Sequence, residues 1–184
     1  MINMDAAFKN NAYRILEQFI RFPTKEFSGR GIARSLNLSH GTVLKHISEL
    51  ERLDMVRKKD TTLYPTFYAN TENQKYRFYK KNWLVFKIKE SGIIEYIQEK
   101  TLSSSIVLFG SGAKGTFSEG SDIDIFVEAQ DSGLATEKYE KKLNRTINIL
   151  FESDVNNLSR ELCNNIINGI VLYGYIKLGK EDGK

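Results

Sequence analysis

Apolar residues in the first part of the chain recur with the period of a helix. Residues 6–21 carry them three and four positions apart, which predicts a one-faced helix that Pro23 ends. The same spacing predicts a short helix over 31–36. Ser39 is a good capping residue, and a longer helix is predicted after it over 40–53, with its inner face at Val43, Ile47, Leu50 and Leu53.

The pattern then changes to that of short strands. Residues 55–59 and 63–69 are predicted to form the two strands of a hairpin, with the turn at 60–62. Two or three helices followed by a hairpin indicate a small domain over 1–72.

Residues 72–100 interleave aromatic and aliphatic residues with lysine and arginine. We interpret this stretch as a long amphipathic helix over 73–92 that links two domains, with Gly92 as its break. Such a helix packs on a neighbouring domain or pairs with a second protomer. Stacking of its aromatic side chains on single-stranded nucleic acid is the alternative.

Short strands alternate with helices in the last part of the chain. Alternation and turn residues predict a mixed sheet with helices over 93–178 and a polar tail over 179–184, so the fold class is α+β. The helix after the third strand is given one buried face, in which Cys163 is a structural thiol, and Gly169 is its stop. The predicted strands are 105–109, 122–128, 145–151 and 170–178, and the predicted helices are 111–117, 133–143 and 155–168.

Composition adds an uneven distribution of charge. Residues 1–100 contain 18 Lys and Arg against 11 Asp and Glu, whereas residues 101–184 contain 9 against 12. A basic front half attracts polyanions. One cysteine in 184 residues allows no internal disulfide, and no Cys/His cluster suggests zinc. No apolar run is long enough for a membrane span and the first residues contain no signal segment, so we expect a cytoplasmic location.

The chemistry of the second half centres on Asp122 and Asp124. They lie two residues apart on a predicted strand, so their carboxylates point to the same side, while Ile123, Ile125 and Val127 point to the core. Two adjacent carboxylates repel each other unless a cation lies between them. Mg²⁺ prefers oxygen ligands and commonly binds one or two carboxylates together with substrate phosphates.

A glycine-serine turn precedes the two acids. Gly110-Ser111 ends the predicted strand 105–109, and the start of the next helix offers free N–H groups to an anion. Lys114 follows one helical turn later and is placed to touch phosphate, although a plain surface lysine is the alternative. Together these residues predict a site for a metal ion and a nucleoside triphosphate.

This order of strand, Gly-Ser, short helix and Asp-x-Asp strand resembles the minimal nucleotidyltransferases of the DNA polymerase β superfamily. The resemblance covers about 93–178. It implies that Gly110 and Ser111 hold the triphosphate, and that Asp122 and Asp124 are catalytic residues that bind Mg²⁺. In this family a third carboxylate on a later strand completes the metal site.

The chain departs from the family pattern at that third position. By strand alternation Asn148 faces the same way as Leu150, and the resemblance implies that it stands where the third Asp is expected. An amide carries no charge and takes no proton. Asn148 is therefore assigned to nucleotide binding, and nucleotide binding can survive while transfer is impaired. Glu128, Glu152 and Asp154 are candidate substitutes for the missing acid.

Residues 32–50, together with the hairpin after them, resemble the winged helix-turn-helix domains common in prokaryotes. The resemblance spans about 8–70 and implies binding of duplex DNA, with one helix in the major groove. We expect His40, Thr42, Lys45 and His46 to face base edges, and Arg34, Arg57, Lys58 and Lys59 to face phosphates. A domain used only for protein contact is the alternative, and a homodimer is a reasonable expectation.

Two functions follow from these features. In the first, a DNA-binding protein carries a nucleotidyltransferase domain that moves a nucleoside monophosphate to a hydroxyl acceptor. In the second, the chain is a transcription regulator whose nucleotidyltransferase domain is inactive and acts as a nucleotide sensor or an interaction module.

Overall fold

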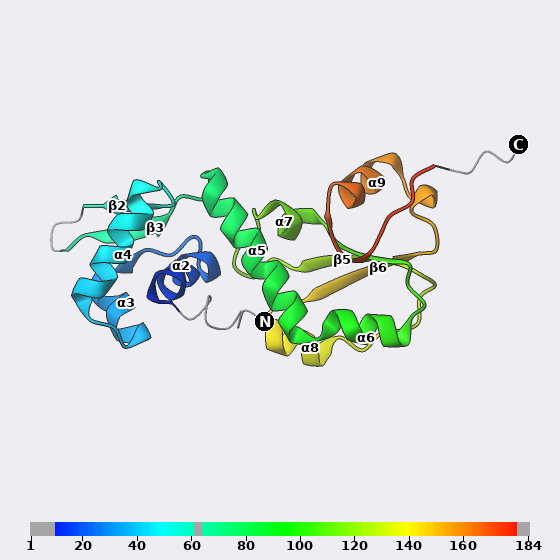
Figure 1. Ribbon diagram of the computed structural model, residues 1–184, viewed down its shortest axis with the longest axis horizontal. Helices are drawn as coiled ribbons and strands as arrows, with labels where there is room; N and C mark the ends of the chain where they lie inside the picture. Colours follow the sequence, from blue (N-terminus) through cyan, green and yellow to red (C-terminus); the bar gives the residue numbers. More distant parts are fainter. Residues whose placement is uncertain (1–9, 61–63, 180–184) are drawn as a thin grey trace, which may run out of the picture. The chain divides into compact units, whose positions relative to one another are not determined.

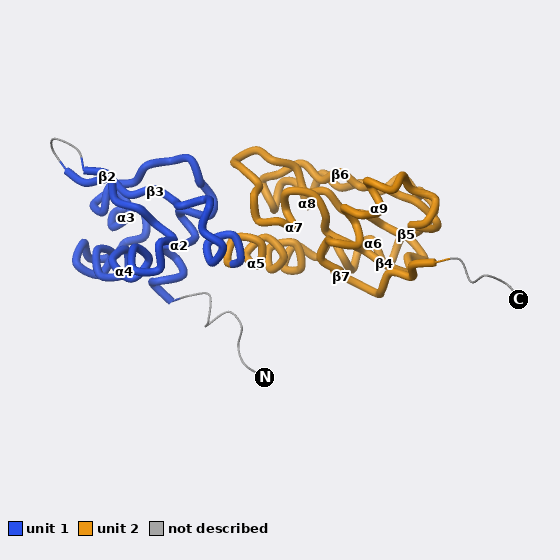
Figure 2. Tube along the Cα trace, turned by 90° about the horizontal axis from the view of Figure 1, so that it is seen from above, with its two compact units in different colours: residues 1–78 blue, residues 79–184 orange. Residues whose placement is uncertain are grey.

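The computed structural model describes residues 10–60 and 64–179, and the chain divides into two compact units. Figure 2 shows unit 1, residues 1–78, in blue and unit 2, residues 79–184, in orange. The predicted tail over 179–184 lies outside the described residues except for Gly179. Each unit contains helices and a sheet of its own, in agreement with the predicted α+β class.

Unit 1 begins with three helices, α2 (Asn11–Arg21), α3 (Gly29–Leu36) and α4 (His40–Arg52). Each starts at a side chain that accepts a hydrogen bond from the first turn: Asn10 for α2, Ser28 for α3 and Ser39 for α4. Ile15, Phe19, Ile32, Val43 and Ile47 are buried between them, as the apolar spacing predicts. The predicted inner position Leu53 is wrong, because α4 ends there and its side chain is 43% exposed.

The sheet of unit 1 contains β1 (Phe27–Ser28), β2 (Val56–Lys59) and β3 (Thr66–Ala69), in the order β1-β3-β2. β2 and β3 pair antiparallel as the predicted hairpin requires, with Val56 opposite Ala69. β3 starts at Thr66, and residues 61 and 62 of the predicted turn lie outside the described residues. β1 is an additional strand that the sequence pattern did not indicate. Its Phe27 pairs with Phe67 and packs edge to face on Phe19 of α2.

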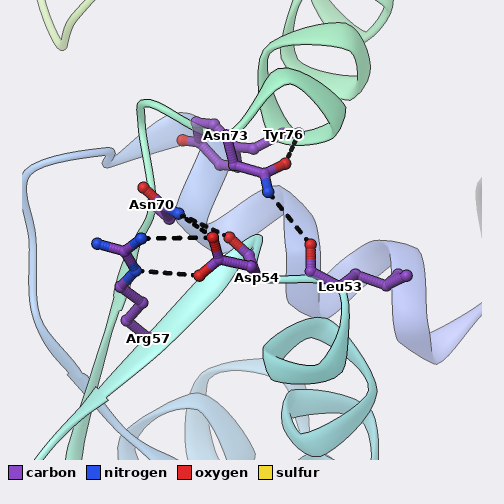
Figure 3. A network of polar contacts seen from close by, with 6 residues as sticks. All are labelled: Leu53, Asp54, Arg57, Asn70, Asn73 and Tyr76. Atoms are coloured by element: carbon purple, nitrogen blue, oxygen red, sulfur yellow. Dashed lines mark hydrogen bonds and ion pairs between the residues drawn. The ribbon is translucent and has the colours of Figure 1, made fainter.

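A polar network ties the end of α4 to the end of the hairpin (Figure 3). Asp54, in the left-handed conformation at φ 52°, accepts two hydrogen bonds from the guanidinium of Arg57, at 3.0 and 3.3 Å. Asn70 donates to the carbonyl and the carboxylate of Asp54, and Asn73 donates to the carbonyl of Leu53. The network thus joins the residues that follow α4 to the residues that follow β3.

The predicted linking helix is α5 (Gln74–Ser91), which is followed by α6 (Ile93–Lys100). Gly92 has a φ of 84° and separates the two helices, as the sequence predicts. The boundary between the two units falls inside α5, after Phe78, so most of the helix belongs to unit 2. Lys80, Leu84 and Ile88 are buried along one side of it.

A four-stranded mixed sheet forms the centre of unit 2, in the order β6-β5-β4-β7. Its strands are β4 (Ser105–Leu108), β5 (Ile123–Glu128), β6 (Ile147–Glu152) and β7 (Ile170–Gly174). β5 runs parallel to β6 and antiparallel to β4, and β7 runs antiparallel to β4. Ile106, Ile125 and Val127 are fully buried on one face, as predicted, and Val107 and Phe126 are buried on the other.

Helices cover both faces of this sheet. Figure 1 shows α9 (Arg160–Ile167) on one face, and α6 and α8 (Glu137–Leu143) on the other. Val107 and Phe126 pack with Val155 and Ile166 beneath α9, and Tyr96 of α6 meets Tyr139 of α8 with ring centroids 5.1 Å apart. The sheet thus has a core on each side, and its polar side chains collect at the strand ends.

Several predicted bounds are wrong. The helix predicted over 155–168 is a 3-10 turn, Val155–Asn157, and then α9, because Asp154 caps the turn and Ser159 caps a new helix. The helix predicted over 133–143 starts at Glu137, and the helix predicted over 111–117 is α7 (Gly110–Lys114). The strand predicted over 170–178 is β7, which ends at Gly174. Cys163 is only partly buried, at the edge of the core beneath α9. Among the described residues, no helix is long and apolar enough to cross a membrane.

Candidate functional site

Asp124 and Asn148 face each other across the parallel strands β5 and β6. The two residues are direct partners in the strand register, so their side chains lie on the same face of the sheet. The Asn148 side-chain nitrogen donates to Asp124 Oδ1 at 3.3 Å and to Asp122 Oδ2 at 3.2 Å. Both carboxylates therefore direct an oxygen to one atom, and the two acids converge as the strand alternation predicts.

Gly110 brings the glycine-serine turn against the same acids. The amide N–H of Phe109 donates to the carbonyl of Asp124 at 3.0 Å, which places the end of β4 beside Asp124. Gly110 has a φ of 66°, and a Cβ atom at this position would collide with Asp124 Oδ2. The close approach of turn and carboxylate therefore requires glycine at residue 110.

The first turn of α7 presents the other predicted phosphate contacts. Ser111 is the second residue of α7 and is partly exposed, and Lys114 is its last residue and is exposed. Gly112 packs closely on Leu84 of α5 and Leu108 of β4, where a Cβ atom would lie 3.0 and 3.1 Å from their methyl groups. This packing fixes the turn after β4. Gly110 of the turn thus lies at the same edge of the sheet as Asp122, Asp124 and Asn148.

The proposed substitutes for a third carboxylate lie elsewhere. Glu128 and Glu152 are four residues beyond Asp124 and Asn148 along β5 and β6, roughly 13 Å away at strand spacing. Glu128 accepts hydrogen bonds from Ser104 and Ser105. Glu152 accepts from the backbone of Ser153, and Asp154 caps the 3-10 turn. None of the three acids can supply a third carboxylate beside Asp122 and Asp124.

An ion placed between Asp122 and Asp124 would meet two carboxylates and one amide. Among residues 10–60 and 64–179, no three or more His, Cys, Asp and Glu side chains come together to hold an ion. Two carboxylates fit Mg²⁺ when phosphate oxygens supply further ligands. The amide oxygen of Asn148 is a neutral ligand and requires rotation of its side chain from the orientation in which the nitrogen faces the acids.

Sequence reasoning missed the residues that hold the loop before Asp122. The Arg145 guanidinium donates to the carbonyls of Ser118 and Ser121, at 3.0 and 2.7 Å. The buried Lys80 donates to the carbonyl of Phe117, and both cations lie over the Phe117 ring. One signal was present: Lys80 is four residues from Tyr76 and from Leu84, on the buried side of α5.

Four of the predicted DNA contacts are engaged with acidic side chains in unit 1. Arg57 pairs with Asp54, Lys58 with Asp60, Lys59 with Glu26 and His46 with Glu49, all at 3.0 Å or less. These are surface pairs, which individually contribute little to stability. A phosphate group must therefore compete with a carboxylate for these side chains.

The other four predicted contacts differ among themselves. Thr42 hydrogen-bonds Ser39 at the start of α4, so its hydroxyl takes part in the helix cap. Arg34 and Lys45 are exposed and form no ion pair among the described residues. His40 lines a cavity of about 190 Å³ between α3, α4 and the hairpin, together with Arg30, Leu44, Tyr64 and Phe67.

Comparison with known families agrees with the architecture of unit 2. Residues 91–176, just under half of the chain, match the family model described as "Polymerase beta, Nucleotidyltransferase". The match includes the turn at Gly110, both acids and Asn148. No curated protein matches the chain. The C-terminal part of the chain is therefore nucleotidyltransferase-like.

Proposed function

We propose that unit 2 binds a nucleoside triphosphate together with Mg²⁺ at Asp122 and Asp124. The observation that carries this proposal is the convergence of the two carboxylates on one nitrogen atom, 3.2 and 3.3 Å away, beside a turn that requires glycine. A divalent cation shared by two such acids removes their mutual repulsion. The family match over 91–176 supports a nucleotide as the ligand.

Each residue has a distinct role in this proposal. Gly110 lets the backbone approach Asp124, and Ser111 offers its hydroxyl and the N–H groups of the first turn of α7 to phosphate oxygens. Lys114, exposed at the end of α7, adds positive charge for the phosphate chain. When bound, Mg²⁺ neutralises phosphate charge and orients the phosphoryl group for attack.

The reaction we propose is transfer of a nucleoside monophosphate to a hydroxyl acceptor. The acceptor oxygen forms a bond to the α-phosphorus, the bond to the β-phosphate oxygen breaks, and pyrophosphate leaves. The hydroxyl proton passes to solvent, because Asn148 takes no proton. The acceptor therefore lacks the base that a third carboxylate at residue 148 would supply, so slow transfer is expected.

A second function is favoured by the same asparagine. With Asn148 in place of a carboxylate, the charges of Asp122 and Asp124 suffice for one divalent cation. The site lacks the third anionic ligand, which would help to bind a metal ion at the attacking oxygen. The domain then binds nucleotide without transferring it, and acts as a sensor or an interaction module of a regulator. The two functions share a nucleotide site and differ in turnover.

We further propose that unit 1 is a winged helix that binds duplex DNA. Three helices followed by an antiparallel hairpin, with β1 added at its edge, support this fold. The exposed Lys45 and Arg34 on α4 and α3 support contact with a polyanion. Because Arg57, Lys58 and Lys59 are engaged with acids, we assign most of the electrostatic attraction to the two helices.

Labelled nucleotides separate these functions. The protein is incubated with each of the four triphosphates and Mg²⁺, and both bound label and released pyrophosphate are measured. Binding with pyrophosphate release supports the enzyme, and binding without release supports the sensor. Absence of binding at millimolar nucleotide, or binding unchanged by Asp122→Ala with Asp124→Ala, rejects the site.

A further inference from the structure

Arg145 holds the turn that leads into Asp122. Residues 118–121 form a tight turn in which the amide of Ser121 donates to the carbonyl of Ser118 and the amide of Ser118 donates to Ser121 Oγ at 2.8 Å. Gly120, at a φ of 82°, makes the turn possible. One nitrogen of Arg145 donates to both the Ser118 and the Ser121 carbonyl, and so closes the turn.

Asp122 is anchored on both of its sides by consecutive residues of one segment. On its N-terminal side the carbonyl of Ser121 accepts from Arg145 at 2.7 Å. On its C-terminal side the amide of Ile123 donates to the carbonyl of Thr146 at 2.9 Å. The backbone around Asp122 is therefore held by two contacts, one from a side chain and one from the strand ladder, while Asn148 donates to the Asp122 carboxylate itself.

Arg145 is itself held in place by an aromatic ring. Its guanidinium carbon lies 4.8 Å from the centroid of Phe117, a residue that is only 2% exposed. Lys80 contacts the same ring at 4.4 Å, and Trp83 stacks on it at 6.4 Å. Burial lowers the pKa of the Arg145 guanidinium, and the charge of Glu119 acts in the opposite direction. Burying a cation costs free energy unless it is hydrogen-bonded, and the two carbonyls of the turn provide these hydrogen bonds.

We propose that Arg145 is a positioning residue for the metal–nucleotide site, and that it acts by fixing the backbone on which Asp122 is carried. Asp124 lies inside β5 and is held by the strand register, so it does not depend on Arg145. Asp122 precedes β5, so on its N-terminal side its backbone is held only through the loop that Arg145 contacts. This role rests on the proposed function, since it concerns the affinity of Asp122 for a bound ion.

The expected effect follows from the behaviour of outer-shell residues around metal ligands. Their loss lowers metal affinity by roughly 10- to 100-fold. Arg145→Ala is therefore expected to weaken Mg²⁺-dependent nucleotide binding by a factor in that range. Arg145→Lys, which keeps the charge but loses the planar fork, is expected to give an intermediate loss.

Two readouts separate positioning from general destabilisation. Hydrogen exchange is followed at the amides of 118–123, where Arg145→Ala is expected to accelerate exchange while β4 and β7 stay protected. Added guanidinium at low millimolar concentration is expected to restore nucleotide affinity to Arg145→Ala in a saturable way, and sodium at equal ionic strength is not. The matched control is Arg160→Ala. Arg160 is exposed at the start of α9 in the same unit, so this variant should change neither the loop exchange nor the nucleotide affinity.

The outcomes are distinct. Faster loop exchange with weaker nucleotide binding and guanidinium rescue supports the role of Arg145. Unchanged loop exchange, or faster exchange with unchanged nucleotide affinity, overturns it while the nucleotide site stands. Absence of nucleotide binding by the wild-type protein overturns the proposed function, and the positioning role with it.

Discussion

Asn148 donates its side-chain amide to Asp124 at 3.3 Å, across a pair of parallel strands in which the two residues are direct partners. The same nitrogen reaches Asp122 at 3.2 Å. An amide in this place relieves the repulsion between two carboxylates through its N–H groups, and it lacks the charge that a third acid would add. The balance between ion binding and turnover in this protein therefore depends on residue 148.

Replacing Asn148 by Asp tests that balance. A third carboxylate adds a full charge to the ion's ligands, so Asn148→Asp should raise Mg²⁺ affinity about tenfold, since charge count tunes such sites. Without Mg²⁺ the repulsion among three adjacent acids should lower the free energy of unfolding by about 1 kcal/mol. Thermal unfolding with and without Mg²⁺ measures both effects.

The control for this variant is Asn164→Asp, which adds the same charge at an exposed position of α9. It should show no dependence of thermal stability on Mg²⁺ beyond that of the wild type. A gain of pyrophosphate release in Asn148→Asp, from a wild type that releases none, would identify an enzyme that has lost its third acid. If Asn148→Asp binds Mg²⁺ no better than the wild type, the ion does not lie between these strands.

Gly110 supports a test of the turn beside Asp124. Gly110→Ala introduces a Cβ atom against the Asp124 carboxylate at a φ of 66°, and should abolish nucleotide binding and lower the free energy of unfolding by about 1–2 kcal/mol. Gly133→Ala is matched in backbone conformation, at a φ of 63°, and has nothing within 4 Å of the added atom. It should share the cost in stability and keep full nucleotide affinity, as measured by equilibrium unfolding and by nucleotide titration. Equal loss of nucleotide affinity in both variants would contradict the close approach.

The network at Asp54 predicts a dependence of stability on pH. The hydrogen bonds from Arg57 hold the pKa of the Asp54 carboxyl below its usual value of 3.8. A lowered folded-state pKa stabilises the protein above the unfolded-state value, and this contribution is lost as the pH falls through the lower, folded-state pKa. Asp54→Asn should therefore be less stable than the wild type at pH 7, and the difference should disappear towards pH values well below 3.8.

Asparagine suits this test because it tolerates the left-handed backbone that Asp54 adopts. Urea unfolding at pH 7 and at successively lower pH values gives the difference between the two proteins. A difference that stays constant over the whole range would show that the Asp54 charge has no part in the network of Figure 3.

The helices of unit 1 and its hairpin should differ in their importance for DNA. Lys45 is exposed on α4 and forms no ion pair among the described residues, whereas Lys59 pairs with Glu26 at 2.6 Å. Lys45→Ala should weaken binding to duplex DNA uniformly across sequences and reduce the salt slope by about one. Lys59→Ala should weaken DNA binding less, because Lys59 must give up its ion pair with Glu26 to contact a phosphate. Fluorescence anisotropy over a range of salt concentrations measures both, and salt-independent binding would favour a protein-contact role for unit 1.

Local patterns were enough to predict the elements that hold the acids. Alternation along 123–127 placed Ile123, Ile125 and Val127 in the core and both carboxylates on the other side, and all three apolar residues are fully buried. The same period of two put Asn148 and Leu150 on one face of their strand, and the family resemblance put Asn148 at the third acid position, which lies opposite Asp124. These predictions succeeded because the side chains involved are neighbours in one strand or in adjacent parallel strands.

Contacts between distant parts of the chain were not predictable in this way. Lys80 and Phe117 are 37 residues apart, and Arg145 is 24 residues from Ser121, so no local spacing records their contacts. The helix predicted over 155–168 failed for a different reason. The apolar spacing continues through Leu158, but the side chain of Ser159 caps a new helix and leaves Leu158 extended.

The central claim is that Asp122 and Asp124 together bind a divalent ion that also holds a nucleoside triphosphate. Titration with Mn²⁺ as a paramagnetic substitute for Mg²⁺, followed by electron paramagnetic resonance with and without a triphosphate, tests it most directly. Tight Mn²⁺ binding that requires the triphosphate, and that is lost in Asp122→Asn with Asp124→Asn, is the predicted result. Ion binding that the double variant retains, or that is indifferent to the triphosphate, would contradict the account.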